Sequence, residues 1–145
     1  MIYLGADKHG YQAIKIVEQW LKQKQMQFEN LGVRSEKNEI KLEDLLPLVA
    51  QKIRNNQENI GIVSCGTGIG VEVGINKFSG IRACLVDDPE LAQWSKVYDN
   101  CNVLCLIGWR PDKKKIEAIL ESWFSAKYDD DEDRLKMIEE FNHWH

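Results

Sequence analysis

The chain has 145 residues, of which 43% are hydrophobic and 29% charged, and this suits one ordinary globular domain. Its net charge of −4 argues against nucleic-acid binding, although a few local cations would be enough to hold an anionic substrate. No stretch approaches the roughly 20 apolar residues that span a bilayer, and the first residues do not form a signal peptide. The spacing of the four cysteines fits neither a disulfide framework nor a zinc site, so we expect free thiols in a cytoplasmic protein without a membrane partner.

Short apolar segments alternate along the chain with amphipathic segments. Strands are predicted at residues 2–6, 28–31, 59–64, 83–86 and 103–107. Helices are predicted at residues 11–24, 42–54, 89–98 and 112–126. This alternation is typical of right-handed βαβ units around a parallel sheet. We therefore predict an α/β fold, a Rossmann-like three-layer sandwich with a five-stranded parallel sheet. Ligands of such sheets bind at the carboxyl ends of the strands.

The end of the chain changes character at residues 129–145. An acidic run at residues 129–133 suits the N-terminus of a helix. The helix then carries Met137, Ile138, Phe141 and Trp144 at helical spacing. This apolar stripe would pack on the body of the same chain or reach a second subunit. We expect it to be buried against a second subunit. We treat residues 1–145 as one domain and expect its five tryptophans to lie mostly in the core or an interface.

A glycine-rich segment gives the strongest local signal. Cys65-Gly66-Thr67-Gly68-Ile69-Gly70 follows a buried strand and opens a helix. Backbone amides in such a turn form a site for an anion, which would also favour the thiolate of Cys65. The spacing of the glycines is not that of a dinucleotide fingerprint, and no Gly-Lys-Ser/Thr ends it. A plain strand-to-helix turn with an inert, buried Cys65 is the alternative.

Two further polar segments lie next to predicted strands. Asp7, Lys8 and His9 follow the first strand, and Asp7 would either cap the next helix or contact a ligand. Residues 98–102 precede the last strand, which is the end away from the expected ligand, so from position alone they form a simple loop.

Several of these segments resemble a known enzyme family. Cys65-Gly66-Thr67-Gly68-Ile69-Gly70, followed by Asn76-Lys77-Phe78-Ser79-Gly80-Ile81-Arg82-Ala83, is similar to the type B ribose-5-phosphate isomerases and the galactose-6-phosphate isomerase subunits. Residues 5–10, 102–105 and 108–110 also fit the family. The resemblance extends to about residue 136.

The resemblance implies an aldose–ketose isomerase for a phosphorylated sugar, working through an enediolate without a metal or cofactor. Cys65 would be the base that moves a proton between neighbouring carbons. Thr67 would hydrogen-bond the sugar near that centre, and the loop amides would stabilise the enediolate oxygen. The residues expected to contact the substrate are Asp7, Lys8, His9, Gly66, Gly68, Ile69, Gly70, Asp99, Arg110, Arg134 and Lys136.

The chain departs from the family at four functional positions. Tyr98 stands where the family has the histidine that opens the sugar ring, and Asp99 where an asparagine follows it. Glu132 and Lys136 stand at the positions of two phosphate-binding arginines. An acidic run disfavours a phosphate. The alternatives are therefore an unphosphorylated or otherwise altered sugar, and a non-catalytic or partner-dependent subunit of a heteromeric isomerase. Because family sites lie between subunits, we expect a homodimer, a dimer of dimers, or a hetero-oligomer with a second family member.

Overall fold

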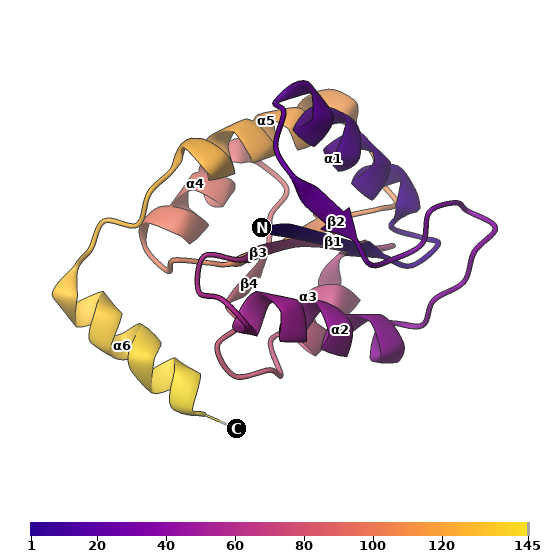
Figure 1. Ribbon diagram of the computed structural model, residues 1–145. Coiled ribbons are helices and arrows are strands. Elements are labelled where there is room, and N and C mark those ends of the chain that lie inside the picture. The colour runs from indigo at the N-terminus through magenta and orange to yellow at the C-terminus, as the bar shows by residue number, and fades with distance from the viewer. Residues whose placement is uncertain (145) are drawn as a thin grey trace.

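The computed structural model describes residues 1–144, which form one five-stranded, all-parallel sheet with six helices (Figure 1). The strands are β1 (Ile2–Ala6), β2 (Phe28–Asn30), β3 (Ile60–Cys65), β4 (Ala83–Leu85) and β5 (Val103–Ile107). The helices are α1 (Tyr11–Gln23), α2 (Leu42–Arg54), α3 (Ile69–Ile75), α4 (Pro89–Val97), α5 (Lys113–Ser125) and α6 (Glu132–His143). The strand order is β2-β1-β3-β5-β4. The predicted three-layer α/β architecture is therefore confirmed, with the ends of the predicted elements shifted by at most one residue.

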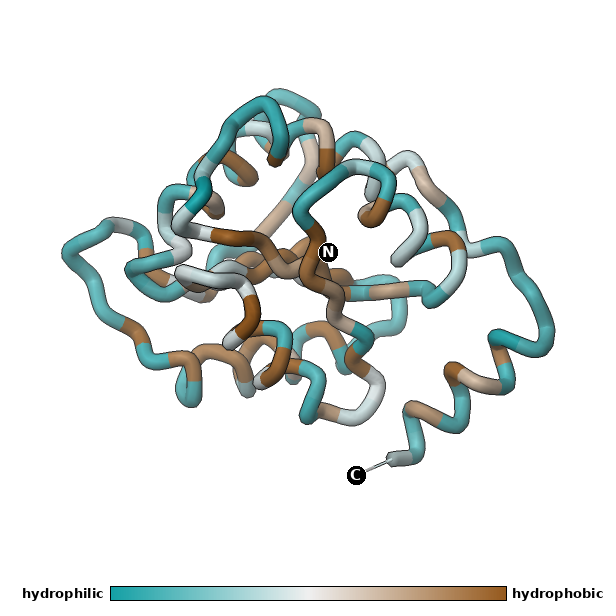
Figure 2. The backbone as a smooth tube through the Cα atoms, turned by 180° about the vertical axis from the view of Figure 1, so that it is seen from behind, coloured by the Kyte–Doolittle hydropathy of each residue, from teal (hydrophilic) through white to brown (hydrophobic). Residues whose placement is uncertain are grey.

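Helices cover both faces of the sheet. Figure 1 shows α1, α4 and α5 on one face and α2 with α3 on the other. The strand residues divide between the two faces because successive side chains of a strand point in opposite directions. In β5, Leu104 and Leu106 join the core under α1 and α5, whereas Val103 and Cys105 join the core under α2 and α3. The interior of the sheet therefore forms a continuous apolar centre, brown in Figure 2.

Aspartates begin the helices of the second half of the chain. Asp88 caps α4 by accepting from Leu91 N, and Asp112 caps α5 by accepting from Lys115 N. Asp131, within the acidic run, caps α6 by accepting from the amides of Asp133 and Arg134. The carboxylates thus satisfy amides that have no partner inside the helix. The run predicted to start the last helix does so.

The last helix stands apart from the two helical layers. An extended connection after α5 leads to α6, which lies to one side of the body in Figures 1 and 2. Ile138 is buried, but Met137, Phe141 and Trp144 remain partly exposed. A cavity of about 490 Å³ lies where α6 faces residues 76–83, lined in part by Ile138, Phe141 and Trp144. The terminal stripe therefore packs only partly on its own chain.

No helix within residues 1–144 is long and apolar enough to cross a membrane.

Candidate active site

The strand order reverses between β1 and β3, the position at which open parallel sheets have a ligand-binding crevice. From β1 the chain passes to β2 on one side and later to β3 on the other side, so the order reverses at the β1–β3 pair. In open parallel sheets, ligands bind beyond the carboxyl ends of the strands at such a switch point. Asp7 follows β1 there and Cys65 ends β3. The two segments selected from the sequence are thus brought together at this edge.

Cys65 lies at the carboxyl edge with its side chain almost enclosed. It pairs with Ile107 of β5 and is only 5% exposed. Its Sγ lies 3.6 Å from the position that a Cβ on Gly70 would occupy, so the sulfur faces the first turn of α3. An alanine at residue 70 would make ordinary van der Waals contact with that sulfur. The thiol therefore lies directly beside the glycine-rich segment.

The glycine-rich segment turns through a left-handed backbone conformation. Gly68 has φ of 76° and begins α3. Side chains rarely adopt this conformation, and a Cβ here would also lie 2.5 Å from Leu85 Cδ1. The Ile69 amide, expected to face an oxyanion, donates to Thr67 Oγ1 at 3.1 Å instead. Thr67 thereby braces the turn.

Asp7 is not the helix cap that the sequence allowed. Gly10 begins α1 without a side-chain cap, and Asp7 Oδ1 instead accepts from the amides of His9 and Gly10, both at 3.0 Å. These bonds hold the turn after β1. Lys8 next to it forms an exposed ion pair with Glu39 at 3.2 Å. The carboxylate is therefore fixed at the crevice by its own backbone.

Three loops meet behind Cys65 with their backbones in contact. The Gly108 amide donates to the Cys65 carbonyl at 2.8 Å, and a Cβ on Gly108 would lie 2.2 Å from the His9 carbonyl oxygen. A Cβ on Gly10 would lie 2.2 Å from the Ser64 carbonyl oxygen. These positions admit no side chain unless a loop moves. We call this contact of Gly10, Ser64, Cys65 and Gly108 the three-loop junction.

Trp109 is a site residue that the sequence did not single out. It was expected in the core or an interface, yet its side chain is 64% exposed and its indole lies over Gly66. The His9 ring meets the indole edge-on, with centroids 5.7 Å apart. Arg110 follows and lies 3.9 Å from Asp87. The sequence signals were its position just after a strand end and the resemblance of residues 108–110 to the family.

The remaining predicted site residues lie away from Cys65. Tyr98 follows α4, which runs back from the carboxyl edge, and Asp99 lines the cavity beside α6. The Arg134 guanidinium stacks on Tyr98, 5.1 Å from the ring centroid, and pairs with Asp129. Lys136 pairs with Asp133 at 3.7 Å.

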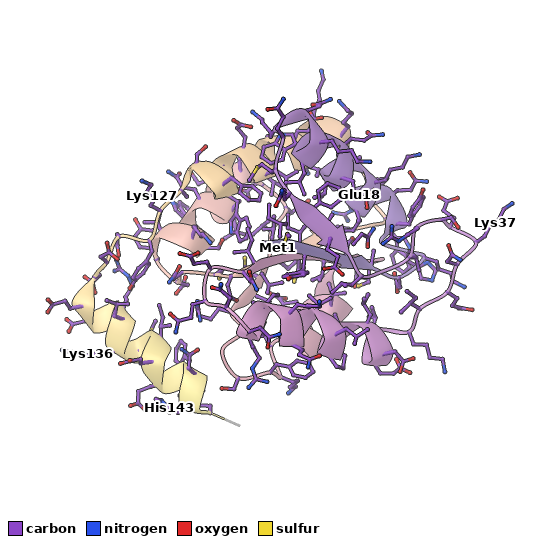
Figure 3. The ribbon with its side chains drawn as sticks, in the orientation of Figure 1. Met1, Glu18, Lys37, Lys127, Lys136 and His143 are labelled. Atoms are coloured by element: carbon purple, nitrogen blue, oxygen red, sulfur yellow. The ribbon has the colours of Figure 1, made fainter. Side chains whose placement is uncertain are left out.

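Figure 3 labels one residue of this distant group. It places Lys136 on α6, on the opposite side of the molecule from Lys37. Lys37 belongs to the β2–α2 connection, which Lys8 contacts through Glu39. Within one chain, the predicted site is therefore split into two groups at opposite ends of the sheet.

The other three cysteines lie within or before strands and not at their carboxyl ends. Burial raises the pKa of the Cys105 thiol, which packs inside the sheet. A hydrogen bond between the thiols of Cys84 and Cys101 lowers the pKa of Cys84 and raises that of Cys101. The residues that the structure describes contain no group of three His, Cys, Asp or Glu side chains able to hold a metal ion.

Known proteins with this sequence pattern and fold are isomerases. Residues 2–140 match the family described as Ribose/Galactose Isomerase. The chain belongs to this family. A probable ribose-5-phosphate isomerase B of Mycoplasma genitalium is 30% identical over 141 residues, which are 97% of this chain and 81% of the relative. The expected family and enzyme class are thereby confirmed.

Two solved structures of the family resemble the whole chain. A ribose 5-phosphate isomerase from Thermotoga maritima superposes with a TM-score of 0.91 at 26% identity, covering 99% of this chain and 97% of that one. Ribose-5-phosphate isomerase B from Mycoplasma genitalium, solved with bound ribulose-5-phosphate, has a TM-score of 0.88 at 30% identity. That alignment covers 97% of this chain and 93% of the other. The likeness to the Thermotoga maritima structure extends over nearly all of this chain, so it includes α6.

Proposed function

We propose that the chain isomerises a phosphorylated aldose and its ketose, of the ribose-5-phosphate or galactose-6-phosphate type. The observation that carries the proposal is the enclosed Cys65 thiol beside the glycine-rich turn, at the switch point of a sheet of this family. As a thiolate, Cys65 removes the proton from the hydroxyl-bearing carbon next to the carbonyl and returns it to the former carbonyl carbon. The proton of that carbon's hydroxyl moves in the same direction, to the former carbonyl oxygen, so the reaction is balanced.

The chain's own groups would stabilise the enediolate between these two proton transfers. The turn at residues 66–70 follows Cys65 directly, so its amides would donate to the enediolate oxygen, and donors aimed at a developing oxyanion are worth several kcal/mol. Thr67 and Ile69 already share a hydrogen bond, so substrate binding would exchange it for one to the sugar. Asp7 would hold sugar hydroxyls through the oxygen that its own turn leaves free. None of these steps calls on a metal or cofactor.

The second group of site residues would come from another subunit. Tyr98, Asp99, Arg134 and Lys136 lie at the opposite end of the sheet from Cys65 in one chain. A twofold axis repeats each surface on the partner, so it would set the second group of one chain against Cys65 of the other. The partly exposed stripe of α6, Met137, Phe141 and Trp144, supports contact with a second chain. We infer a homodimer or dimer of dimers with composite sites.

A second candidate function follows from the weak provision for binding a phosphate. Arg134 is flanked by the acidic run and already pairs with Asp129, and Lys136 pairs with Asp133. Arginine grips a phosphate through two parallel hydrogen bonds, which lysine cannot provide. This arrangement favours, as the alternative, a sugar without phosphate or a site completed by a second family member that supplies the arginines.

The deciding experiment compares sugars on the purified chain alone. Ribose 5-phosphate, galactose 6-phosphate and their unphosphorylated forms are incubated with the chain and with Cys65→Ala, and aldose and ketose are separated chromatographically. The main proposal is supported if the native chain turns over a phosphorylated sugar and Cys65→Ala does not. Turnover confined to an unphosphorylated sugar favours the alternative. Turnover that appears only with a second family member favours the heteromeric enzyme.

A further inference from the structure

Trp109 is tied to the residues around Cys65 by its backbone. The Trp109 amide donates to the Gly66 carbonyl at 2.9 Å, one residue along from the bond between Gly108 and Cys65. The end of β5 and the start of the glycine-rich turn are thus bonded at two consecutive positions. The Trp109 side chain therefore starts from a fixed point beside the proposed base.

The indole itself lies on the backbone of Gly66. A Cβ on Gly66 would fall 2.3 Å from Cε2 and 2.6 Å from Cζ2 of the ring, so the indole occupies the space that a side chain would need. The His9 ring braces it from another side, at an interplanar angle of 80°. Two contacts in different directions fix the orientation of this ring.

Most of the fixed ring nevertheless remains open. At 64% exposure, Trp109 is among the most exposed large apolar side chains of residues 1–144. Single exposed apolar side chains are common and need no function. This one differs because Gly66 and His9 both contact it, and because it lies over the turn that follows Cys65, next to the switch point where ligands bind. An apolar surface kept in this orientation suits a ligand with an apolar face.

A sugar has such a face, and inorganic phosphate does not. The C–H groups of a sugar chain or ring present a weakly positive apolar surface, which fits the negative face of an indole. The hydroxyls on the opposite side would then point to polar groups such as Asp7 and Lys8. An aromatic platform with a few convergent polar groups is the usual make-up of a small-molecule site.

We propose that Trp109 is a specificity-determining residue whose exposed indole binds the carbon skeleton of the sugar. The inference rests on the proposed function for the location of the substrate beside Cys65. The platform contacts the sugar and not the phosphate, and it binds ground state and transition state alike. Loss of the indole therefore weakens binding of a sugar phosphate, raises KM and leaves kcat nearly unchanged.

The test measures binding separately from turnover. Isothermal titration calorimetry follows ribose 5-phosphate, galactose 6-phosphate and inorganic phosphate on the native chain, Trp109→Leu and Trp109→Phe. Leucine keeps an apolar cover on Gly66 but has no aromatic face. We expect Trp109→Leu to weaken sugar-phosphate binding roughly tenfold, Trp109→Phe to weaken it less, and both to change phosphate binding less than about twofold. Leu48→Ala, which removes an exposed apolar side chain from α2, is the control and leaves all affinities unchanged.

The outcomes separate the inference from the proposed function. If the native chain isomerises a sugar phosphate and Trp109→Leu binds it equally well, the inference is wrong and the proposed function stands. If the native chain binds a sugar phosphate without turnover, and Trp109→Leu binds it more weakly, the inference stands and the proposed function falls. If Trp109→Leu weakens the binding of sugar phosphates and of inorganic phosphate equally, the inference that the indole binds the sugar is wrong. It is also wrong if the native chain binds neither sugar phosphate.

Discussion

Two inactive variants should restore each other's activity if the site is shared between subunits. β3 has six residues, and at about 3.3 Å per residue the sheet separates the Cys65 edge from the edge near Tyr98 by roughly 15 to 20 Å. A side chain cannot bridge that distance. Cys65→Ala would disable one half of a site and Arg134→Ala the other half, so a mixed dimer would have one site with both defects and one intact site.

The expected recovery follows from counting sites. Mixing equal amounts of the two variants gives about half mixed dimers, each with one of its two sites intact, so activity returns to about a quarter of the native value. The variants carry different affinity tags, are unfolded together, refolded and assayed for isomerisation of the best sugar phosphate. Sedimentation of each variant checks that it still dimerises. Activity of the mixture no greater than the sum of the two parents, or full activity of Arg134→Ala alone, would refute the composite site.

Four further outcomes test other parts of the structure. Cys65→Ala should lower kcat by about 10²- to 10⁴-fold with the fold intact by circular dichroism; retained turnover would remove Cys65 from the mechanism. Glu132→Arg should lower KM for the phosphorylated sugar but not for its unphosphorylated form, and equal effects on both would exclude a phosphate contact at residue 132. Gly108→Ala should lower the free energy of unfolding in urea by about 1 to 3 kcal/mol, because its Cβ would meet the His9 carbonyl; an unchanged midpoint would contradict the three-loop junction. Burial lowers the pKa of Lys96, so between that lowered pKa and about 10.4 the unfolded chain binds more protons than the folded chain. The free energy of unfolding of the native chain, relative to that of Lys96→Met, should therefore rise with pH across this window. A difference that does not change with pH would show that burial does not perturb the pKa of Lys96.

The sequence was sufficient for the fold because local patterns determined it. Short apolar runs such as Ile2–Ala6 predict strands, and apolar residues at helical spacing, as in Leu42–Arg54, predict helices. Because strands and helices alternate along the chain, the rule for βαβ units predicts that the strands are parallel. The place of Cys65 followed in the same way, since it comes directly before the glycine turn. Element ends were less certain because the last turn of a helix competes with its loop.

The details of the site depended on contacts between distant segments. The position of Trp109 depends on the missing side chain of Gly66, which is far away in the sequence but adjacent in space. From the sequence, Asp7 would either cap the next helix or contact a ligand. The turn around Gly10 excludes the cap, because Asp7 Oδ1 accepts from the amides of His9 and Gly10. The apolar stripe of the last helix predicted an apolar contact for that helix. How much of the stripe packs on its own chain depends on the path of the connection before α6, and that connection has no periodic pattern from which its path could be predicted.

The three-loop junction has a consequence for how this scaffold can change its substrate. Its shape is determined by backbone atoms of Gly10, Ser64, Cys65 and Gly108 in direct contact, without any side chain between them. Residues that surround the opening, such as Lys8 and Trp109, project from this frame and can be exchanged without moving the amides or the sulfur. Directed evolution toward a new sugar should therefore succeed through substitutions at the rim, while the chemical centre is inherited unchanged.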